Sequence, residues 1–520
     1  MPTVREAVMK LLGDLGMTTI FGNPGSTELP LLRDFSKEFR YILGLQESIV
    51  VGMADGYAQA TGNAALVNLH SAAGVGHAMG NIFTAYRNRT PLVITAGQQA
   101  RSILPYEPFL FATEATELPK PYVKWSNEPA RGEDVPAAIA RAYYTAMQPP
   151  CGPTFVSVPV DDWDRTTEWI APREVTRTVL ADPAFVARLG DRLDRCARPA
   201  FVVGPGVDRE CAWDEVVSLA ERHQALVWVS PMSPRCSFPE RHALFAGFLP
   251  AIREQIVECL DGHDLVLALG AQVFTYHIEG FGPHVPDGTE VFQIVDDPNV
   301  AAWTPASVSI VGSVRHAVSN LLDRRDTPKR PAPRRRDIPP RVTAHGAISV
   351  AYLMQTLSDL RPSDSVIVEE SPSSRKTMQV YLPIDRPQSF FTCASGGLGH
   401  GLPAAVGIAL AKARTQRVVG LFGDGSAMYS IQALWSAAQA GLPLTIVIVN
   451  NGSYAALAEF SSHFKMTQLV GTRLGGIDFA GLACSLGCTG RRVERPEELA
   501  PALTDALGSS APSLVDVAVA

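Results

Sequence analysis

Short apolar runs alternate with longer helical patterns along the whole chain, and this alternation constrains the fold more than any other feature. Consecutive positions within each run are apolar, so both faces of the corresponding strand must be buried. Strands of this kind, separated by helices, form parallel sheets that helices cover on both sides. We therefore expect an α/β protein made of doubly wound parallel sheets. The expected strands are 18–22, 64–70, 91–97, 154–160, 199–206, 225–230, 264–270, 291–297, 365–371, 417–425, 444–452 and 513–519.

The chain is too long for a single hydrophobic core, since it has 520 residues and one core rarely organises more than about 250–300. The clearest linker is the segment 323–346, which is rich in proline and arginine and lacks apolar periodicity. Another boundary is expected near 165–185. The sequence thus predicts three domains: a first over 1–180, a middle domain over 181–325 and, after a linker at 326–345, a third over 346–520.

Charge and composition exclude several classes of function. The net charge of −7 argues against a nucleic-acid-binding protein, which needs a basic face. No apolar run approaches the about 20 residues that span a bilayer, and the N-terminus lacks the apolar core of a signal peptide. The eight cysteines are scattered without the spacing of a metal or redox site. We expect a cytoplasmic protein that binds neither nucleic acid nor membrane.

Two strand ends near the C-terminus carry oxygen ligands. Asp424 follows one apolar run, and Asn451 follows the next run along the chain. In a parallel sheet two such strands, joined by one helix, end side by side. A carboxylate, an amide oxygen and free backbone carbonyls suit Mg²⁺ or Ca²⁺, and the backbone N–H groups of Gly425 and Ser426 at a helix start suit phosphate. Each turn alone is common, but together they predict a cation that holds a diphosphate.

The segment from GDGSAMYS to the Asn-Asn-Gly turn resembles the diphosphate motif of the thiamine-diphosphate enzymes. Nearly end to end, in FGNPGSTELP, RYILGLQE, VNLHSAAG and SVPVDDWD, the chain resembles the benzoylformate decarboxylase family. The resemblance implies pyrimidine-binding, middle and diphosphate-binding domains, with thiamine diphosphate and Mg²⁺ (or Ca²⁺) as cofactors. It implies non-oxidative decarboxylation of an aromatic 2-oxo acid to an aldehyde and CO₂. The implied metal ligands are Asp424, Asn451 and the backbone carbonyl of Ser453.

The same resemblance implies a set of cofactor contacts. The Gly396 carbonyl would accept from the 4′-amino group of the cofactor, and Leu398 would separate its two rings. Ser373 lies in a loop where the family has threonines. The complete implied set is Pro24, Gly25, Glu47, Ser373, Gly396, Leu398, Gly423, Asp424, Gly425, Ser426, Asn451, Ser453, Tyr454, Ala455 and Ala456.

Glu47 is the expected cofactor-activating acid. It stands where an apolar run meets an apolar helical pattern, so we expect its side chain to be buried. A buried carboxyl group can share a proton with a ring nitrogen. Alternatively, a glutamate at this place could have a purely structural role, as a negative charge at the positive N-terminus of a helix. The neighbouring ADGYAQATG segment, which resembles the same superfamily, favours the catalytic interpretation.

Three further residues are expected to act on the substrate. A Gly/Pro loop exposes Ser26, His70 ends a strand, and His277 follows a strand of the middle domain. A single histidine is more often structural than catalytic, and His77 and His400 keep the structural interpretation. By resemblance, Ser26 would hold the substrate carboxylate, while His70 and His277 would relay protons. The expected substrate pocket comprises Ser26, His70, His277, Thr392, Ala456 and Phe460, although Thr392 stands where the family has an aromatic residue.

Other functions remain open at this point. A synthase of the acetohydroxyacid type would share Glu47 and the diphosphate motif while forming a carbon–carbon bond, but it would not need the two histidines. A decarboxylase for another 2-oxo acid and a non-catalytic cofactor-binding protein are further alternatives. The family builds its site from two subunits, so Glu47 and Asp424 would come from different chains. The resemblance therefore implies at least a homodimer and, in the family, a homotetramer.

Overall fold

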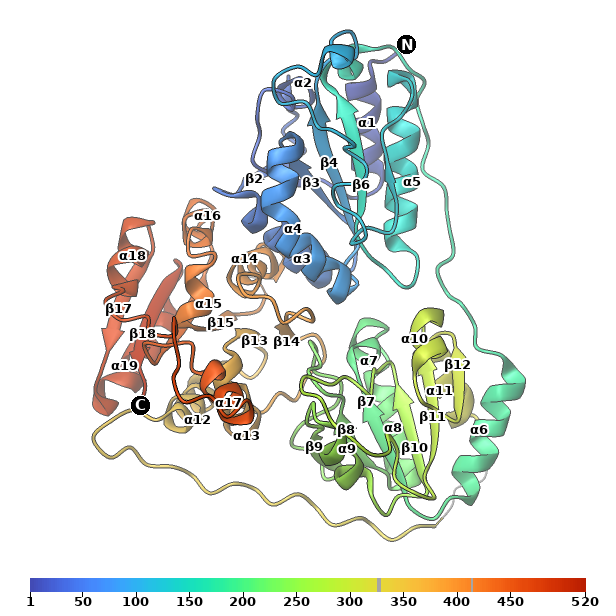
Figure 1. Cartoon of the computed structure of the whole chain (residues 1–520), viewed down its shortest axis with the longest axis vertical. Coiled ribbons are helices and arrows are strands. Elements are labelled where there is room, and N and C mark those ends of the chain that lie inside the picture. The colour runs from blue at the N-terminus through green and yellow to red at the C-terminus, as the bar shows by residue number, and fades with distance from the viewer. Residues whose placement is uncertain (325–328, 413–414) are drawn as a thin grey trace. The chain divides into compact units, whose positions relative to one another are not determined.

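The computed structural model describes residues 1–324, 329–412 and 415–520 (Figure 1). The chain forms two compact units: Met1–Thr176, Thr343–Lys376 and Ser395–Ala520 make the first, and Arg177–Val342 and Thr377–Ala394 make the second. The predicted α/β class is confirmed, because the paired strands of the three sheets are parallel. The predicted boundary between residues 325 and 326 lies outside the described residues.

The N-terminal sheet of the first unit has the strand order β2-β1-β3-β4-β6-β5. Its central strands are buried at every position, as continuous apolar runs require. Helices α1 and α5 pack together on one face and share a core with the strands, whereas α3 and α4 cover the other (Figure 1). The elements are α1 Val4–Asp14, β1 Thr19–Gly22, α2 Leu29–Leu32, β2 Arg40–Leu43, α3 Glu47–Thr61, β3 Ala65–Leu69, α4 Ser71–Asn88, β4 Leu92–Gln98, η1 Leu104–Tyr106, β5 Ser126–Asn127, η2 Gly132–Asp134, α5 Val135–Met147, β6 Thr154–Pro159 and η3 Val160–Asp164.

Local signals set the ends of these helices. Thr3 caps α1 in a capping box with Glu6, which satisfies backbone N–H groups that the first turn leaves unpaired. Helix α3 ends at Gly62, whose φ of 68° lies in the left-handed region that glycine adopts without strain. At its start, the Gln46 side chain accepts the Ser48 and Ile49 N–H groups, which makes Glu47 the first residue of α3.

The C-terminal sheet of the first unit contains the strand order β13-β15-β16-β18-β17. Its strands are also parallel, and the registers of β15 with β16 bring their carboxyl ends to one edge. The elements are α12 Val350–Leu360, β13 Val366–Glu370, η4 Pro372–Ser374, α13 Arg375–Tyr381, α14 Gly401–Lys412, β15 Val418–Gly423, α15 Asp424–Met428, α16 Ala433–Gln439, β16 Leu444–Asn450, α17 Ala456–His463, α18 Phe479–Ser485, β17 Thr489–Val493, α19 Pro496–Gly508 and β18 Ser513–Ala518.

Helices α3 and α14 cross within the first unit with their backbones in contact. A Cβ atom added at Gly56 would lie 2.2 Å from the Ala404 carbonyl oxygen. One added at Gly407 would lie 1.9 Å from the Met53 carbonyl oxygen. No larger residue fits at these two positions without moving a helix, so glycine is what allows the crossing.

The second unit is built around a third parallel sheet, with the strand order β12-β11-β10-β7-β8-β9. Apolar side chains fill a core on each of its faces. The unit also contains β14, Phe390–Thr392. Its other elements are α6 Pro183–Arg195, β7 Pro199–Val203, α7 Pro205–Arg209, α8 Trp213–His223, β8 Leu226–Val229, β9 Phe245–Phe248, α9 Arg253–Leu260, β10 Leu265–Leu269, β11 Glu290–Val295, α10 Pro298–Trp303, β12 Val308–Val311 and α11 Val314–Leu322.

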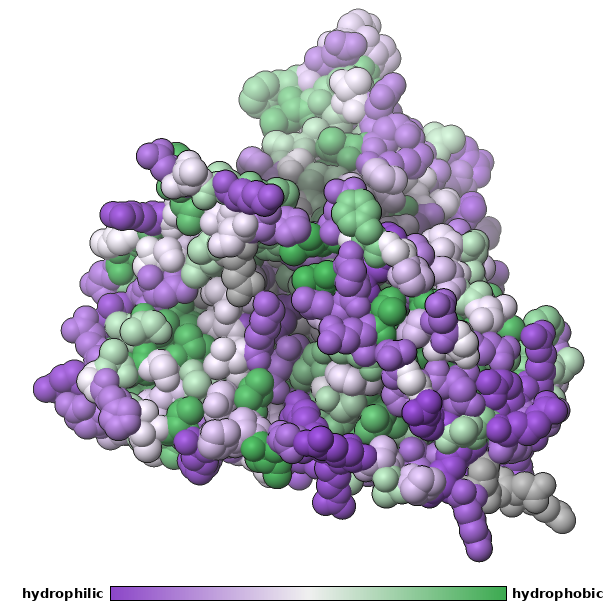
Figure 2. Space-filling model, turned by 60° about the horizontal axis from the view of Figure 1, so that its bottom comes forward, coloured by the Kyte–Doolittle hydropathy of each residue, from purple (hydrophilic) through white to green (hydrophobic). Residues whose placement is uncertain are grey.

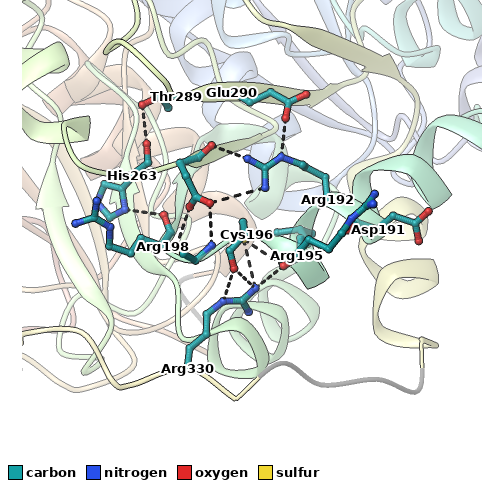
Figure 3. Close-up of polar contacts among 12 residues, drawn as sticks. Asp191, Arg192, Arg195, Cys196, Arg198, His263, Thr289, Glu290 and Arg330 are labelled. Carbon is teal, nitrogen blue, oxygen red and sulfur yellow. Dashed lines mark hydrogen bonds and ion pairs between the residues drawn. The ribbon is translucent and has the colours of Figure 1, made fainter.

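Arg330, in the predicted linker, fastens that segment to the second unit (Figure 3). Its guanidinium donates to the carbonyl oxygens of Leu193 and Cys196, at the C-terminal end of α6. A cation is favourable there because the last carbonyls of a helix carry partial negative charge. Nearby, Arg192 forms an ion pair with Glu290 at 2.7 Å. Residues 329–344 contain neither helix nor strand, so these side-chain contacts hold the start of the segment.

One face of the molecule shows how its surface residues are distributed. Hydrophobic side chains are interspersed among hydrophilic ones over the face drawn in Figure 2. Across residues 1–324, 329–412 and 415–520, no helix is long and apolar enough to cross a membrane. The eight cysteines all lie in these ranges and are free thiols.

We predict that Gly407→Ala destabilises the first unit, although alanine favours helices. The new methyl group would collide with the Met53 carbonyl oxygen, and overpacking of this kind costs about 1–3 kcal/mol. Gly508→Ala, at the end of α19 where nothing lies within 4 Å of the added Cβ, is the matched control. Thermal unfolding followed by circular dichroism should show a clearly lower midpoint for Gly407→Ala only. Equal thermal midpoints for the two variants would mean that α3 and α14 leave room for a methyl group at position 407.

Candidate active site

Asp424, Asn451 and Ser453 come together at the adjoining ends of β15 and β16. The Ser453 N–H group donates to Asp424 Oδ2 at 3.2 Å and to Asn451 Oδ1 at 3.0 Å. The Asp424 side chain is buried, and burial raises the pKa of its carboxyl group above the ordinary value. A divalent cation would favour the ionised form and offset this cost.

The chemistry of this donor set fits a hard cation with a diphosphate. Among the described residues no three His, Cys, Asp or Glu side chains form a metal cluster. The Asp424 set instead combines one carboxylate with an amide oxygen and a backbone carbonyl, which suits Mg²⁺ or Ca²⁺ when phosphate and water complete the shell. Gly425 lies against the Tyr454 ring, where an added Cβ would be 2.3 Å from Cε1. The Gly425 N–H group donates to Asp424 Oδ1 at 2.7 Å, so this expected phosphate donor is engaged by the carboxylate.

The loop that carries Gly396 and Leu398 is held by a buried glutamate. Both carboxylate oxygens of Glu370, at the end of β13, accept backbone N–H groups: Gly399 and Gly401 at 2.6 Å and His400 at 2.9 Å. Burial raises the pKa of Glu370 to about 7, although the three N–H donors oppose the shift. Gly396 has a φ of 74° and no atom within 4 Å of an added Cβ, so its exposed backbone can receive a ligand group. Leu398 is half-buried.

Asp55 and His400 form a buried ion pair where α3 meets α14. His400 Nε2 lies 2.5 Å from Asp55 Oδ2, and Gln59 and Asn88 also donate to that oxygen. Burial opposes the charge on Asp55, but the His400 imidazolium outweighs it and lowers the pKa of that carboxyl group. Burial likewise opposes the charge on His400, but the Asp55 carboxylate outweighs it and raises the pKa of the imidazole. This pairing agrees with the structural role expected for His400.

Ser26 and His70 follow two strands of the N-terminal sheet in the same unit. Ser26 is exposed on the loop after β1, as expected, and His70 follows β3 as the N-cap residue of α4. His70 Nδ1 lies 2.8 Å from Glu28 Oε2 and 3.2 Å from Thr27 Oγ1. Gly25 lies against the imidazole, because an added Cβ would be 2.2 Å from Nδ1. The imidazole is therefore fixed in place by the loop that presents Ser26.

Glu47 is the first residue of α3 and faces α4. Its side chain is 14% exposed, so it is largely but not fully buried. Glu47 Oε2 contacts Nδ1 of His77 at 3.0 Å, and Gly74 leaves room for Oε1, since an added Cβ would be 3.2 Å away. His70, Gly74 and His77 all belong to the start of α4, so that helix connects the surroundings of Glu47 with those of His70.

The remaining expected residues lie in several places. Pro24 is exposed beside Ser26, and Ser373 is exposed on η4. Ala455 precedes α17, and Ala456 and Phe460 occupy positions i and i+4 of that helix, on one face. His277 and Thr392 belong to the second unit, where their N–H groups donate to the carbonyls of Ala251 and Pro234. Gly423 is the N-cap residue of α15, followed by buried Ser426.

Comparisons with known proteins assign the family. Three models match the chain: the thiamine pyrophosphate enzyme N-terminal TPP binding domain at residues 2–116, the central domain at 186–321 and the C-terminal TPP binding domain at 373–517. The chain belongs to the thiamine pyrophosphate enzymes. It is 44% identical to a protein named benzoylformate decarboxylase from Pseudomonas aeruginosa, over 99% of both chains.

Two further proteins differ in how similar they are to this chain. A solved structure of a thiamine diphosphate-dependent 4-hydroxybenzoylformate decarboxylase from Rhodococcus jostii is 40% identical, with a TM-score of 0.96 over 100% of this chain and 99% of that one. The large subunit of acetolactate synthase isozyme 3 from Escherichia coli is 26% identical, over 96% of this chain and 92% of that protein. The chain is thus more similar to these aryl 2-oxo acid decarboxylases than to this synthase.

Sequence patterns did not indicate the buried carboxylates that hold the loops of the candidate site. Glu370 lies 29 to 31 residues from the N–H groups that it accepts, and Asp55 lies 345 residues from His400. No local pattern signals contacts at such separations. Glu28 has a local signal, because it is an acidic residue two positions after Ser26 in a Gly/Pro loop.

We predict that the Asp55–His400 pair stabilises the fold in a pH window and that this stability is lost both at lower and at higher pH. The lowered pKa of Asp55 contributes stability that is lost as pH falls through its folded value. The raised pKa of His400 contributes stability that is lost as pH rises through its folded value. His400→Gln should therefore cost about 3–5 kcal/mol in the window between the two, because it leaves a buried carboxylate without its cation.

Thermal midpoints measured across pH for the wild type, His400→Gln and Asp55→Asn/His400→Gln test this. The double variant should recover part of the loss, since it removes the uncompensated charge. A difference between the wild type and the double variant that is constant with pH would contradict the ion pair.

Proposed function

We propose that the chain catalyses thiamine-diphosphate-dependent, non-oxidative decarboxylation of an aryl 2-oxo acid such as benzoylformate, releasing an aldehyde and CO₂. The observation that carries the proposal is His70, held at Nδ1 by the buried Glu28 carboxylate beside exposed Ser26. An oriented histidine, in contact with the loop that exposes a hydroxyl group, can bind an acid and transfer a proton. The names of the Pseudomonas and Rhodococcus relatives support the same reaction class.

The C-terminal sheet would hold the cofactor. Asp424, Asn451 and the Ser453 carbonyl would bind the cation that neutralises the diphosphate, and the Gly396 carbonyl would accept from the 4′-amino group. When bound, thiamine diphosphate supplies a carbon nucleophile and an electron sink for the loss of CO₂. The convergence of Asp424, Asn451 and Ser453 within hydrogen-bond distance supports this assignment. Leu398, Gly423, Ser426, Tyr454 and Ala455 complete the proposed contacts, with Ser373 of η4 and, from the N-terminal sheet, Pro24 and Gly25.

Glu47 would hold the proton that activates the cofactor. Its carboxyl group is largely enclosed between the starts of α3 and α4, so water competes poorly for that proton. Gly74 keeps Oε1 accessible, because a larger residue would crowd that oxygen.

Ser26, His70 and His277 would act on the substrate. The Ser26 hydroxyl would donate to the substrate carboxylate, and the two imidazoles would deliver and remove protons as the charge on the substrate changes. Histidine suits both directions because its ordinary pKa lies near neutrality. Thr392, Ala456 and Phe460 would shape the pocket for the aryl group, with small Ala456 leaving space and Phe460 supplying an apolar wall one turn along α17.

We also propose a homo-oligomer, with a homodimer as the minimal unit and a homotetramer as the expected assembly. Large apolar side chains are exposed next to the proposed site: Tyr429 is 60% exposed, Leu457 47% and Leu45 44%. Burial of these side chains by a second chain would remove apolar surface from water, which favours association. Glu47 and Asp424 of different subunits would then share one cofactor.

A cytoplasmic location is part of the same proposal. The eight cysteines are all free, and Cys211 and Cys484 are exposed. Exposed thiols persist in a reducing compartment and become oxidised elsewhere.

A panel of 2-oxo acids tests the proposed function directly. With added thiamine diphosphate and Mg²⁺, benzoylformate should release CO₂ and benzaldehyde faster than pyruvate or a branched 2-oxo acid does. Prior chelation of the metal should abolish turnover, and Mg²⁺ with cofactor should restore it. No CO₂ from any acid would refute the proposal. A ligated hydroxy-keto acid as the main product would favour a synthase instead.

We predict that Glu47→Gln retains thiamine diphosphate but loses at least about 100-fold in kcat, because an amide cannot exchange the activating proton. The matched control is Glu497→Gln, whose side chain is 67% exposed on α19 and should leave kcat unchanged. Tryptophan fluorescence during cofactor titration measures binding, and steady-state CO₂ release measures turnover. Near-normal turnover of Glu47→Gln would remove the proton-holding role from this residue.

A further inference from the structure

We propose that Glu28 is a positioning residue for His70: it fixes the tautomer that carries its proton on Nδ1, and so leaves Nε2 to exchange protons with the substrate. The inference rests on the proposed function only in naming the substrate as the group that Nε2 meets. The tautomer itself follows from the hydrogen bonds of the N-terminal sheet.

The donors around Glu28 determine which nitrogen is protonated. Glu28 Oε1 accepts the Gly97 N–H group at 2.9 Å and the Thr27 hydroxyl at 2.7 Å. Glu28 Oε2 accepts the Gly25 N–H group at 2.9 Å and lies 2.8 Å from His70 Nδ1. A carboxylate has no hydrogen to give, so the contact with His70 is a hydrogen bond only if Nδ1 is the donor.

Thr27 supports the same assignment. Its hydroxyl has a single hydrogen, which goes to Glu28 Oε1, so towards His70 Nδ1 at 3.2 Å it can only accept. Both polar neighbours of Nδ1 are therefore acceptors. In the neutral imidazole the lone pair then lies on Nε2, the nitrogen that Glu28 does not contact.

The Glu28 carboxylate is buried against one edge of the His70 ring. The Glu28 side chain is 1% exposed, whereas that of His70 is 20% exposed. Gly25 and Gly97 allow this approach, because a Cβ on Gly25 would be 2.2 Å from Nδ1 and one on Gly97 would be 2.2 Å from Glu28 Oε1. The His70 ring is thus held by contacts along its Nδ1 edge.

The charged groups that face His70 come from two elements. As the N-cap residue of α4, His70 lies at the positive end of that helix. The Glu28 carboxylate faces the ring from the loop after β1, with Oε2 2.8 Å from Nδ1. Tyr41 of β2 stays neutral, since burial, and then the charge of Glu28, raise the pKa of its phenol. Glu28 is therefore the carboxylate that contacts the ring, and it does so at Nδ1.

A purely structural role is the competing explanation. Glu28 also braces the loop of residues 23–28 through Gly25, Thr27 and Gly97, so its removal could loosen Ser26 without any effect on proton transfer. Only measurements that report on His70 itself separate the two explanations.

The kinetic test compares the holoenzymes of Glu28→Gln, Glu28→Asp and Glu221→Gln. Glutamine keeps the size of Glu28 but removes its charge, so kcat should fall about 10- to 100-fold, as supporting partners of functional side chains typically cost when removed. KM should change less, and the acidic limb of the kcat/KM profile should move to lower pH. Glu28→Asp should restore that limb partially. Glu221→Gln removes a comparable carboxylate–imidazole contact, 3.1 Å from His242, and should match the wild type.

The second measurement does not depend on turnover. Solid-state NMR of the holoenzyme labelled with ¹⁵N-histidine, with His70→Asn to assign the signal, should show the neutral His70 ring protonated at Nδ1. Glu28→Gln should mix the two tautomers. Protonation of wild-type His70 at Nε2, or an unchanged pH profile in Glu28→Gln, would overturn the inference. If no 2-oxo acid is turned over but the tautomer is as stated, the proposed function fails and the positioning by Glu28 stands.

Discussion

The backbone contact between α3 and α14 is the constraint on which the first unit depends. Gly56 and Gly407 let the two helices touch, and the Asp55–His400 pair fixes how they meet. Each helix begins beside residues of the proposed site: Glu47 opens α3, and the loop with Gly396 and Leu398 leads into α14. Rigid packing along the helices thus sets the positions of groups at their ends, where chemistry requires accuracy of a fraction of an ångström.

Parallel topology explains why the closeness of Asp424 and Asn451 could be predicted. Strands that run the same way end at the same edge, so Asp424 and Asn451 become neighbours without any special contact between them. The twelve expected strands are confirmed, because central strands need continuous apolar sequence. Strands that were not predicted include β2, β5, β9, β12 and β17, all at sheet edges. An edge strand is half-exposed, as in β17, and leaves no uninterrupted apolar run.

The supporting carboxylates could not be predicted in the same way. Glu28, Asp55 and Glu370 act through partners that the fold brings close, and their own neighbours in sequence do not distinguish them from other buried acids. Glu370 is a clear case, since it ends an apolar strand and accepts three N–H groups from a loop about 30 residues away. Sequence motifs point to the residues proposed for the chemistry, whereas the residues that contact and orient them are brought close only by the fold.

The order of synthesis leaves Asp55 without its partner His400 for a time. Asp55 leaves the ribosome 345 residues before its partner exists, which at about 5–20 residues per second is a delay of roughly 20–70 s. During that time the N-terminal sheet can form, but the face of α3 that will meet α14 carries a carboxylate without its cation. Water must solvate that face until α14 is translated. The last third of the chain therefore completes a surface that the first third begins, and a nascent chain stopped before residue 400 would display it uncovered.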